Sequence, residues 1–114
     1  MQKLKNSELD RLSIEAFKSI EKTPLLVVLD NVRSLNNVGS VFRTSDAFRI
    51  EHIYLCGITA TPPHKDIQKT ALGSTESISW SYAKNTFNIV KKLQQKNIQV
   101  LAIEQARNAT MLND

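Results

Sequence analysis

The chain has 114 residues, a length typical of one globular domain, and 41% of them are hydrophobic against 23% charged. That balance excludes wholesale disorder, because enough apolar side chains are present to build a core. Fifteen lysines and arginines against eleven acidic residues give a net charge of +4, which permits a polyanionic partner without requiring one.

Several features exclude other classes of protein. The longest apolar runs, such as residues 25–29, are far shorter than the ~20 residues that cross a bilayer, so we expect no integral membrane protein. No apolar signal segment follows the N-terminus, and the single cysteine, Cys56, excludes a disulfide framework and a cysteine-based zinc cluster. His52 and His64 have no carboxylate or cysteine arranged around them, so no metal site is expected. These observations favour a cytoplasmic protein without a metal.

The first predicted elements are a helix and a buried strand. Residues 1–23 are predicted to be an amino-terminal helical extension, because apolar residues recur there at helical spacing: Leu9, Leu12, Ala16 and Ile20. Pro24 interrupts that pattern. The continuous apolar run over residues 25–29, which ends at Asp30, is typical of a strand that is buried on both faces.

The rest of the chain alternates between helical and strand patterns. The further predicted elements are a helix over residues 38–48, a strand over 50–56, a short helix over 65–72, a strand over 77–82, a helix around 87–93 and a strand over 98–103. Strands separated by helices imply right-handed crossovers, a parallel α/β sheet of Rossmann-like type, and ligands at the carboxyl ends of the strands. Because no helix follows the last predicted strand, we expect residues 24–114 to be the front part of a longer domain.

The segment after the first strand carries the most informative polar residues. If Asn37 caps the following helix, its core face consists of Val38, Val41, Phe42 and Phe48. Arg43 then points away from the core, and Gly39, one turn earlier, is expected to leave an open space beside the guanidinium. A sugar or a phosphate would fit there, near the unpaired N–H groups of the helix start.

The same residues also allow a purely structural interpretation. Asn37 is a common N-cap, Gly39 would permit close packing of helix and strand, and Arg43 could pair with Asp46 on a solvated face. Arg33, in the preceding loop, is either a second phosphate contact or a solvated cation. Spacing alone leaves both interpretations open.

The pattern Asn37-x-Gly39-x-x-x-Arg43, after an apolar strand and an Asp-Asn turn, resembles motif 1 of the SpoU-type RNA ribose 2′-O-methyltransferases of the SPOUT superfamily. The resemblance covers about residues 24–114 and continues in the family's order through three further segments: Ile53-Tyr54-Leu55, Lys69-x-x-x-Gly73-Ser74 and Val100-Leu101-Ala102-Ile103.

The resemblance implies a SPOUT fold, a homodimer, and transfer of a methyl group from S-adenosylmethionine to a ribose 2′-hydroxyl of tRNA or rRNA. It assigns the catalytic role to Arg43 and a supporting role to Asn37. Since a guanidinium is a poor base, we expect Arg43 to hold the adjacent phosphate and to stabilise the developing alkoxide. The other expected RNA contacts are Arg33, Gly39, Ser40 and His64.

The sequence departs from the family's pattern in one respect. Motifs 2 and 3, which line the donor site in the family, are not among these 114 residues, and only Ile103 and Glu104 are expected to belong to that site. We therefore expect the chain by itself not to bind S-adenosylmethionine tightly. The alternative function is a non-catalytic RNA-binding or dimerisation module. A phospho-accepting receiver domain centred on Asp30 is a further alternative, although the acidic pair that such domains use for Mg²⁺ is not evident.

Overall fold

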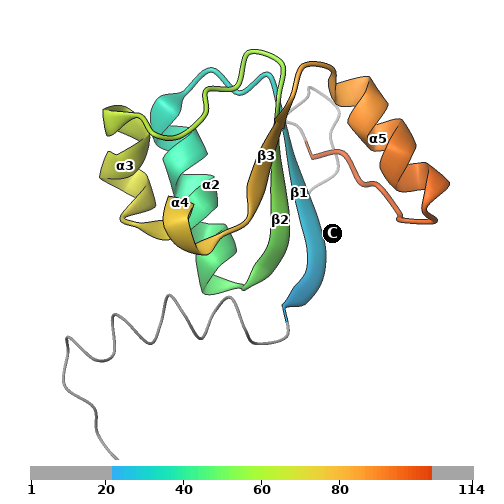
Figure 1. Cartoon of the computed structure of the whole chain (residues 1–114), viewed down its shortest axis with the longest axis horizontal. Helices are drawn as coiled ribbons and strands as arrows, with labels where there is room; N and C mark the ends of the chain where they lie inside the picture. Colours follow the sequence, from blue (N-terminus) through green and yellow to red (C-terminus); the bar gives the residue numbers. More distant parts are fainter. Residues whose placement is uncertain (1–21, 104–114) are drawn as a thin grey trace, which may run out of the picture.

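The computed structural model describes residues 22–103 as a parallel α/β fold (Figure 1). Its three strands pair in parallel in the order β1-β2-β3, and a crossover containing a helix joins each strand to the next. The strands are β1 (Thr23–Asp30), β2 (Ile50–Cys56) and β3 (Trp80–Ala83). The helices are α2 (Leu35–Ala47), α3 (Lys65–Ala71), α4 (Ser74–Ser77) and α5 (Thr86–Gln95). The predicted parallel α/β class is confirmed, whereas the helix expected within residues 7–20 lies outside the described residues.

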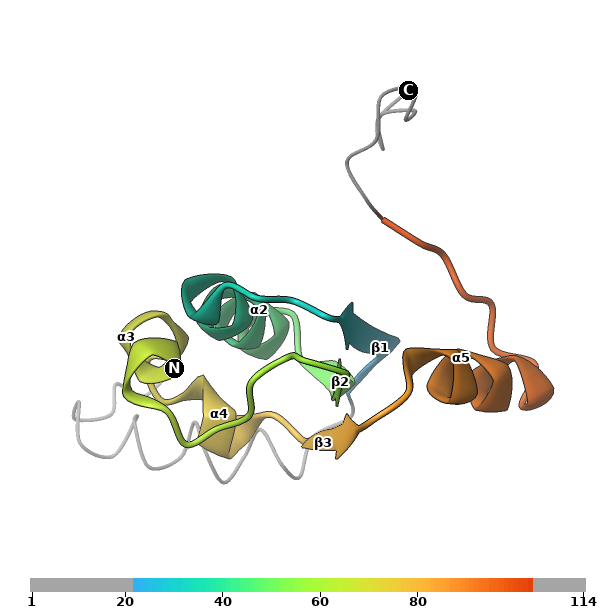
Figure 2. The ribbon, with the colours of Figure 1, turned by 90° about the horizontal axis from the view of Figure 1, so that it is seen from above.

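The helices are distributed unequally over the sheet. Figure 2 shows α2, α3 and α4 together on one side of the three strands, with α5 on the other side. Within residues 22–103, no helix is long and apolar enough to span a membrane.

The core lies between the sheet and the layer of α2, α3 and α4. Phe42 of α2 is fully buried and forms a T-shaped pair with Trp80, with ring centroids 6.5 Å apart. The other buried hydrophobic residues of this cluster are Leu29, Val38, Ile50, Ile53, Leu55, Ile67, Ala71 and Ile78. Phe48, expected on the core face, is instead 66% exposed, because α2 ends at Ala47 and Phe48 is its C-cap.

Two strand predictions need correction. Residue 77 belongs to α4, a short helix that follows Gly73 in the left-handed conformation, so the third strand begins only at Trp80. Residues 98–103 form no strand: a cavity of about 330 Å³ lies between β1 and residues 98–101. A strand needs a hydrogen-bonded neighbour, and the β propensity of this segment does not supply one.

His52 joins β2 to β3 on the side of the sheet opposite the core. Its Nδ1 lies 2.7 Å from the Ser79 hydroxyl and its Nε2 lies 2.8 Å from the Ser81 hydroxyl. Burial lowers the pKa of His52, an effect that the neighbouring Glu51 carboxylate opposes. The folded state therefore favours the neutral imidazole, bonded at both nitrogens.

This lowered pKa predicts a loss of stability in mild acid. Between the pKa of His52 in the folded state and its unfolded value near 6.5, the unfolded chain binds more protons, so the free energy of unfolding decreases as pH falls through that range. Urea unfolding followed at about pH 7.5 and about pH 5.5 measures the decrease. In the His52→Asn variant the decrease should be smaller; an identical pH dependence in both proteins would show that His52 does not cause it.

Candidate active site

The loop between β1 and α2 is fixed to the segment that follows β2. Asn31 adopts a left-handed conformation with φ of 52°, and its side-chain oxygen accepts a hydrogen bond from the Ile58 N–H at 2.9 Å. The buried Thr59 hydroxyl accepts from the Val32 N–H at 3.0 Å and lies 2.8 Å from the Cys56 carbonyl. The Asp-Asn turn was predicted, whereas Thr59 was missed because its partner is 27 residues away.

Helix α2 begins earlier than predicted. Its N-cap is Ser34, whose hydroxyl accepts a hydrogen bond from the Asn37 N–H at 3.1 Å, and the helix starts at Leu35. The assignment of Asn37 as the cap is therefore wrong. A serine three residues before Asn37 is an equally good N-cap, and this was the signal in the sequence. Inside the first turn, the Asn37 side chain is exposed and available to a ligand.

Gly39 packs against α3 and leaves no open space beside Arg43. A Cβ at this buried position would contact the Thr70 hydroxyl and the Ile67 carbonyl, and would lie 3.0 Å from the Ala71 nitrogen. The Thr70 hydroxyl donates to the Asn36 carbonyl at 2.9 Å and so ties the two helices together. The expectation of a sugar or phosphate beside Gly39 is therefore wrong; close packing accounts for this glycine, with a helix and not a strand as its neighbour.

Arg43 is exposed on the outer surface of α2. Among residues 22–103 it makes no hydrogen bond and no ion pair, and the alternative pairing with Asp46 is not formed. Burial raises the pKa of Asp46. The guanidinium is thus available to an anionic ligand.

Arg43 and Asn37 do not lie side by side. Six residues along an α-helix correspond to a rotation that places the two side chains about 120° apart, with Ser40 between them. Asn37 and Ser40 line a largely apolar groove of about 550 Å³ between α2 and β1. The exposed ring of Phe48 lies at the end of this groove. A ligand that contacts both motif residues must therefore lie across the Ser40 surface.

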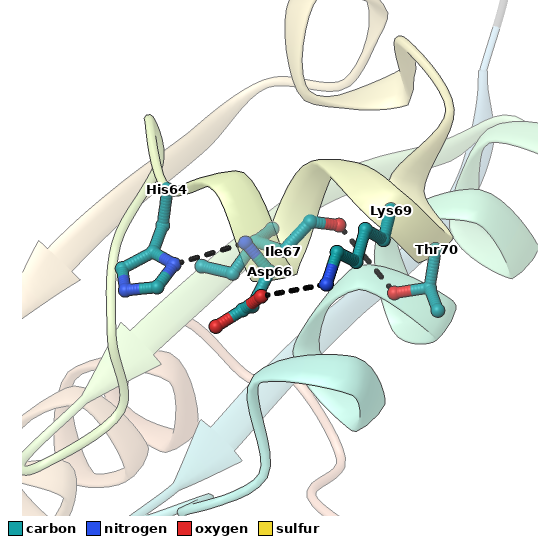
Figure 3. Close-up of polar contacts among 5 residues, drawn as sticks. All are labelled: His64, Asp66, Ile67, Lys69 and Thr70. Carbon is teal, nitrogen blue, oxygen red and sulfur yellow. Dashed lines mark hydrogen bonds and ion pairs between the residues drawn. The ribbon is translucent and has the colours of Figure 1, made fainter.

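The remaining predicted RNA contacts lie beyond this groove. Arg33 lines a separate polar cleft of about 360 Å³ between the β1–α2 loop and α3. His64 is the exposed N-cap of α3, and its Nδ1 accepts a hydrogen bond from the Asp66 N–H at 3.1 Å (Figure 3). This bond gives His64 a structural role and leaves its Nε2 as the atom that a ligand would meet.

A third opening lies at the carboxyl ends of the strands, where ligands of parallel α/β sheets bind. It measures about 530 Å³ and is lined by Asp30, Asn31, Gly57, Lys84, Asn85, Thr86, Phe87 and Val90. Its polar groups are largely bonded to each other or to the chain, since Asp30 accepts from the Thr86 hydroxyl at 2.7 Å. In the part of the chain that the structure describes, no three metal-binding side chains come together around Asp30 or elsewhere.

Of the two residues expected at the donor site, the structure describes one. Ile103, expected to line it, is 75% exposed at the end of the described range, and Glu104 lies outside that range. The groove beside α2, the cleft beside Arg33 and the opening at the carboxyl ends of the strands are all open to solvent.

The three parallel strands and their crossover helices are arranged as in solved structures of SpoU and TrmH methyltransferases, which defines the fold class of the chain. The family model described as SpoU rRNA Methylase family matches residues 24–114, and the chain belongs to this family. The predicted SPOUT fold is thereby confirmed.

Curated relatives are similar over most of this chain. The 23S rRNA (guanosine-2′-O-)-methyltransferase RlmB of Pseudomonas aeruginosa is 29% identical over 87 residues, which are 76% of this chain and 35% of the relative. The enzyme of the same name from Vibrio parahaemolyticus is 28% identical over 91 residues, 80% of this chain and 37% of the relative. The chain thus spans about a third of the length of these relatives.

Solved structures agree with the fold. A putative RNA methyltransferase of the TrmH family from Porphyromonas gingivalis superposes with a TM-score of 0.60 at 26% identity, over 69% of this chain and 32% of that protein. The SpoU methyltransferase AviRb from Streptomyces viridochromogenes, in complex with AdoMet, gives a TM-score of 0.58 over 68% of this chain and 29% of its own length. At 19% identity, the second comparison supports the fold alone.

Proposed function

We propose that this chain is the acceptor-binding part of an RNA methyltransferase that transfers a methyl group from S-adenosylmethionine to a ribose 2′-hydroxyl of ribosomal RNA. The observation that carries the proposal is the family match over residues 24–114, which includes the free, exposed Arg43. The names of the curated relatives support ribosomal RNA over tRNA as the substrate class. Residues 24–114 then correspond to the part of the methyltransferase domain that carries motif 1.

Arg43 acts on the acceptor in this proposal. A guanidinium with a pKa above about 12 does not accept a proton readily, but it holds a phosphate with paired N–H donors. Bound to the phosphate next to the target ribose, Arg43 orients the 2′-hydroxyl and stabilises negative charge as that hydroxyl loses its proton. Asn37 and Ser40 contact the nucleotide along the groove between α2 and β1. The methyl donor binds residues other than those described.

We also propose that the active protein is a cytoplasmic homodimer. The apolar Phe48 supports a contact with a second copy, because it is 66% exposed at the end of the groove between α2 and β1 that lies away from Asn37 and Ser40. Light scattering coupled to size-exclusion chromatography tests this assignment: a dimeric mass supports it, and a monomeric mass at micromolar concentration contradicts it.

Methyl transfer to purified RNA tests the main proposal. The protein encoded by the complete reading frame is incubated with radiolabelled S-adenosylmethionine in two separate reactions. One contains unmodified ribosomal RNA and the other contains unmodified tRNA. Label in the ribosomal RNA, located at a ribose by resistance of the adjacent bond to alkaline hydrolysis, supports the proposal. RNA binding without label in either RNA favours the non-catalytic module, and label confined to tRNA contradicts the choice of ribosomal RNA.

A further inference from the structure

We propose that Lys69 and Arg33 form a phosphate-binding cleft for the RNA backbone, distinct from the surface that carries Arg43. This inference rests on the proposed function and assigns a role to a residue that motif 1 does not include. The cleft is the opening of about 360 Å³ between the β1–α2 loop and α3, lined by Arg33, Ser34, Leu35, Asn36, Asp66 and Lys69.

The two cations come from different elements and meet at the same opening. Arg33 is exposed in the loop before α2, and Lys69 belongs to α3 with its side chain 66% exposed. Two positive side chains facing one polar cleft are suited to the oxygens of an internucleotide phosphate, since Arg offers a planar fork and Lys a mobile point charge. The volume admits a phosphate together with its adjoining sugar.

Hydrogen bonds within the chain hold the two walls of the cleft in place. Thr70, next to Lys69 in the sequence, donates to the Asn36 carbonyl and so fixes α3 against the first turn of α2. On the other wall, the Thr59 hydroxyl accepts from Val32, the residue before Arg33. The backbone segments that carry Arg33 and Lys69 are thus fixed beside the cleft before RNA binds, which reduces the ordering that binding requires.

Asp66 is the one acidic residue in the cleft. Its carboxylate lies 3.2 Å from the Lys69 Nζ at i,i+3 spacing, and Figure 3 shows the two side chains on the same side of α3. Because this pair is exposed, it is weak and readily exchanged for a phosphate contact. Asp66 therefore does not hold the Lys69 ammonium firmly in the free protein, and its own charge opposes the phosphate.

RNA affinity of matched variants tests the cleft. Anisotropy of a short fluorescein-labelled single-stranded RNA is measured with the 114-residue chain over a range of salt concentrations. We expect Lys69→Ala to weaken binding about three- to tenfold at low salt and to reduce the salt slope by about 0.7, the value for one phosphate contact on a single strand. The control is Lys65→Ala, which removes the same charge from the same helix outside the cleft and should change affinity less than about twofold.

A second pair of variants tests the removal of a negative charge, which should have the opposite effect on RNA affinity. Asp66→Asn removes negative charge from the cleft and should tighten RNA binding, whereas Glu51→Gln removes the same charge from β2, away from the cleft, and should not. Equal effects of Lys69→Ala and Lys65→Ala, or no RNA binding by the unaltered chain, would overturn the inference. A different result would contradict the proposed function alone: RNA binds through the cleft, but the protein from the complete reading frame transfers no methyl group.

Discussion

Replacing Arg43 by alanine should lower the turnover of methyl transfer at least about a hundredfold, the cost typical of removing one preorganised donor to a developing oxyanion. The affinity for S-adenosylmethionine should stay nearly unchanged, because Arg43 is assigned to the acceptor and not to the methyl donor. Single-turnover methyl transfer to ribosomal RNA and calorimetry with the donor, both on the protein from the complete reading frame, measure the two quantities.

Two further variants separate charge from geometry. Arg43→Lys keeps the positive charge but loses the planar fork, so we expect it to recover part of the lost turnover and to remain at least about tenfold slower than the original. Lys91→Ala removes a positive charge from the exposed surface of α5 and should leave turnover unchanged. Since Arg43 is exposed and has no partner within residues 22–103, its replacement should not unfold the chain. Unaltered turnover in Arg43→Ala would contradict the catalytic assignment.

The fold was predictable where local pattern and tertiary environment agree. The apolar run of β1 and the strand pattern over residues 50–56 both form strands, because each has a neighbour to pair with and a core to cover. Residues 98–103 have an equally good strand pattern but no neighbouring strand at hydrogen-bonding distance, so they remain irregular. Strand propensity therefore reflects the side chains of a segment, whereas strand formation also requires a neighbouring strand to which its backbone can hydrogen-bond.

The exposure of the candidate site residues was predictable from the sequence, but their arrangement was not. Motif 1 predicts a site on α2, and Arg43, Asn37 and Ser40 all reach the surface there. The spacing along one helix does not report what packs on it, and α3 fills the space beside Gly39. The contact between Thr70 and Asn36 joins residues 34 positions apart, and that between Thr59 and Val32 joins residues 27 apart. No periodicity within either segment encodes these pairs.

Gly39→Ala should therefore destabilise the fold although alanine is the better helix former. The added methyl would meet the Ile67 carbonyl, which belongs to the backbone and cannot rotate away, as well as the Thr70 hydroxyl. Overpacking of this kind costs about 1–3 kcal/mol, and a backbone contact places it at the upper end of that range. The gain in helix propensity offsets about 1 kcal/mol, which leaves a net loss of about 2 kcal/mol in the free energy of unfolding. Urea unfolding of the chain measures it.

Matched variants test whether packing against α3 causes this loss of stability. Ser40, the next residue of α2, is exposed. Ser40→Ala should therefore change the free energy of unfolding by less than about 0.5 kcal/mol. Thr70→Ala removes one of the groups that the new methyl meets, so the double variant with Gly39→Ala should lose less stability than the sum of the single variants, by about 0.5–1 kcal/mol. Strict additivity would contradict the packing of Gly39 against Thr70.

Forcing α2 and α3 apart should also open the phosphate cleft, because Lys69 lies on α3 next to Thr70 and Arg33 precedes α2. Gly39→Ala should therefore weaken RNA binding even where the chain stays folded.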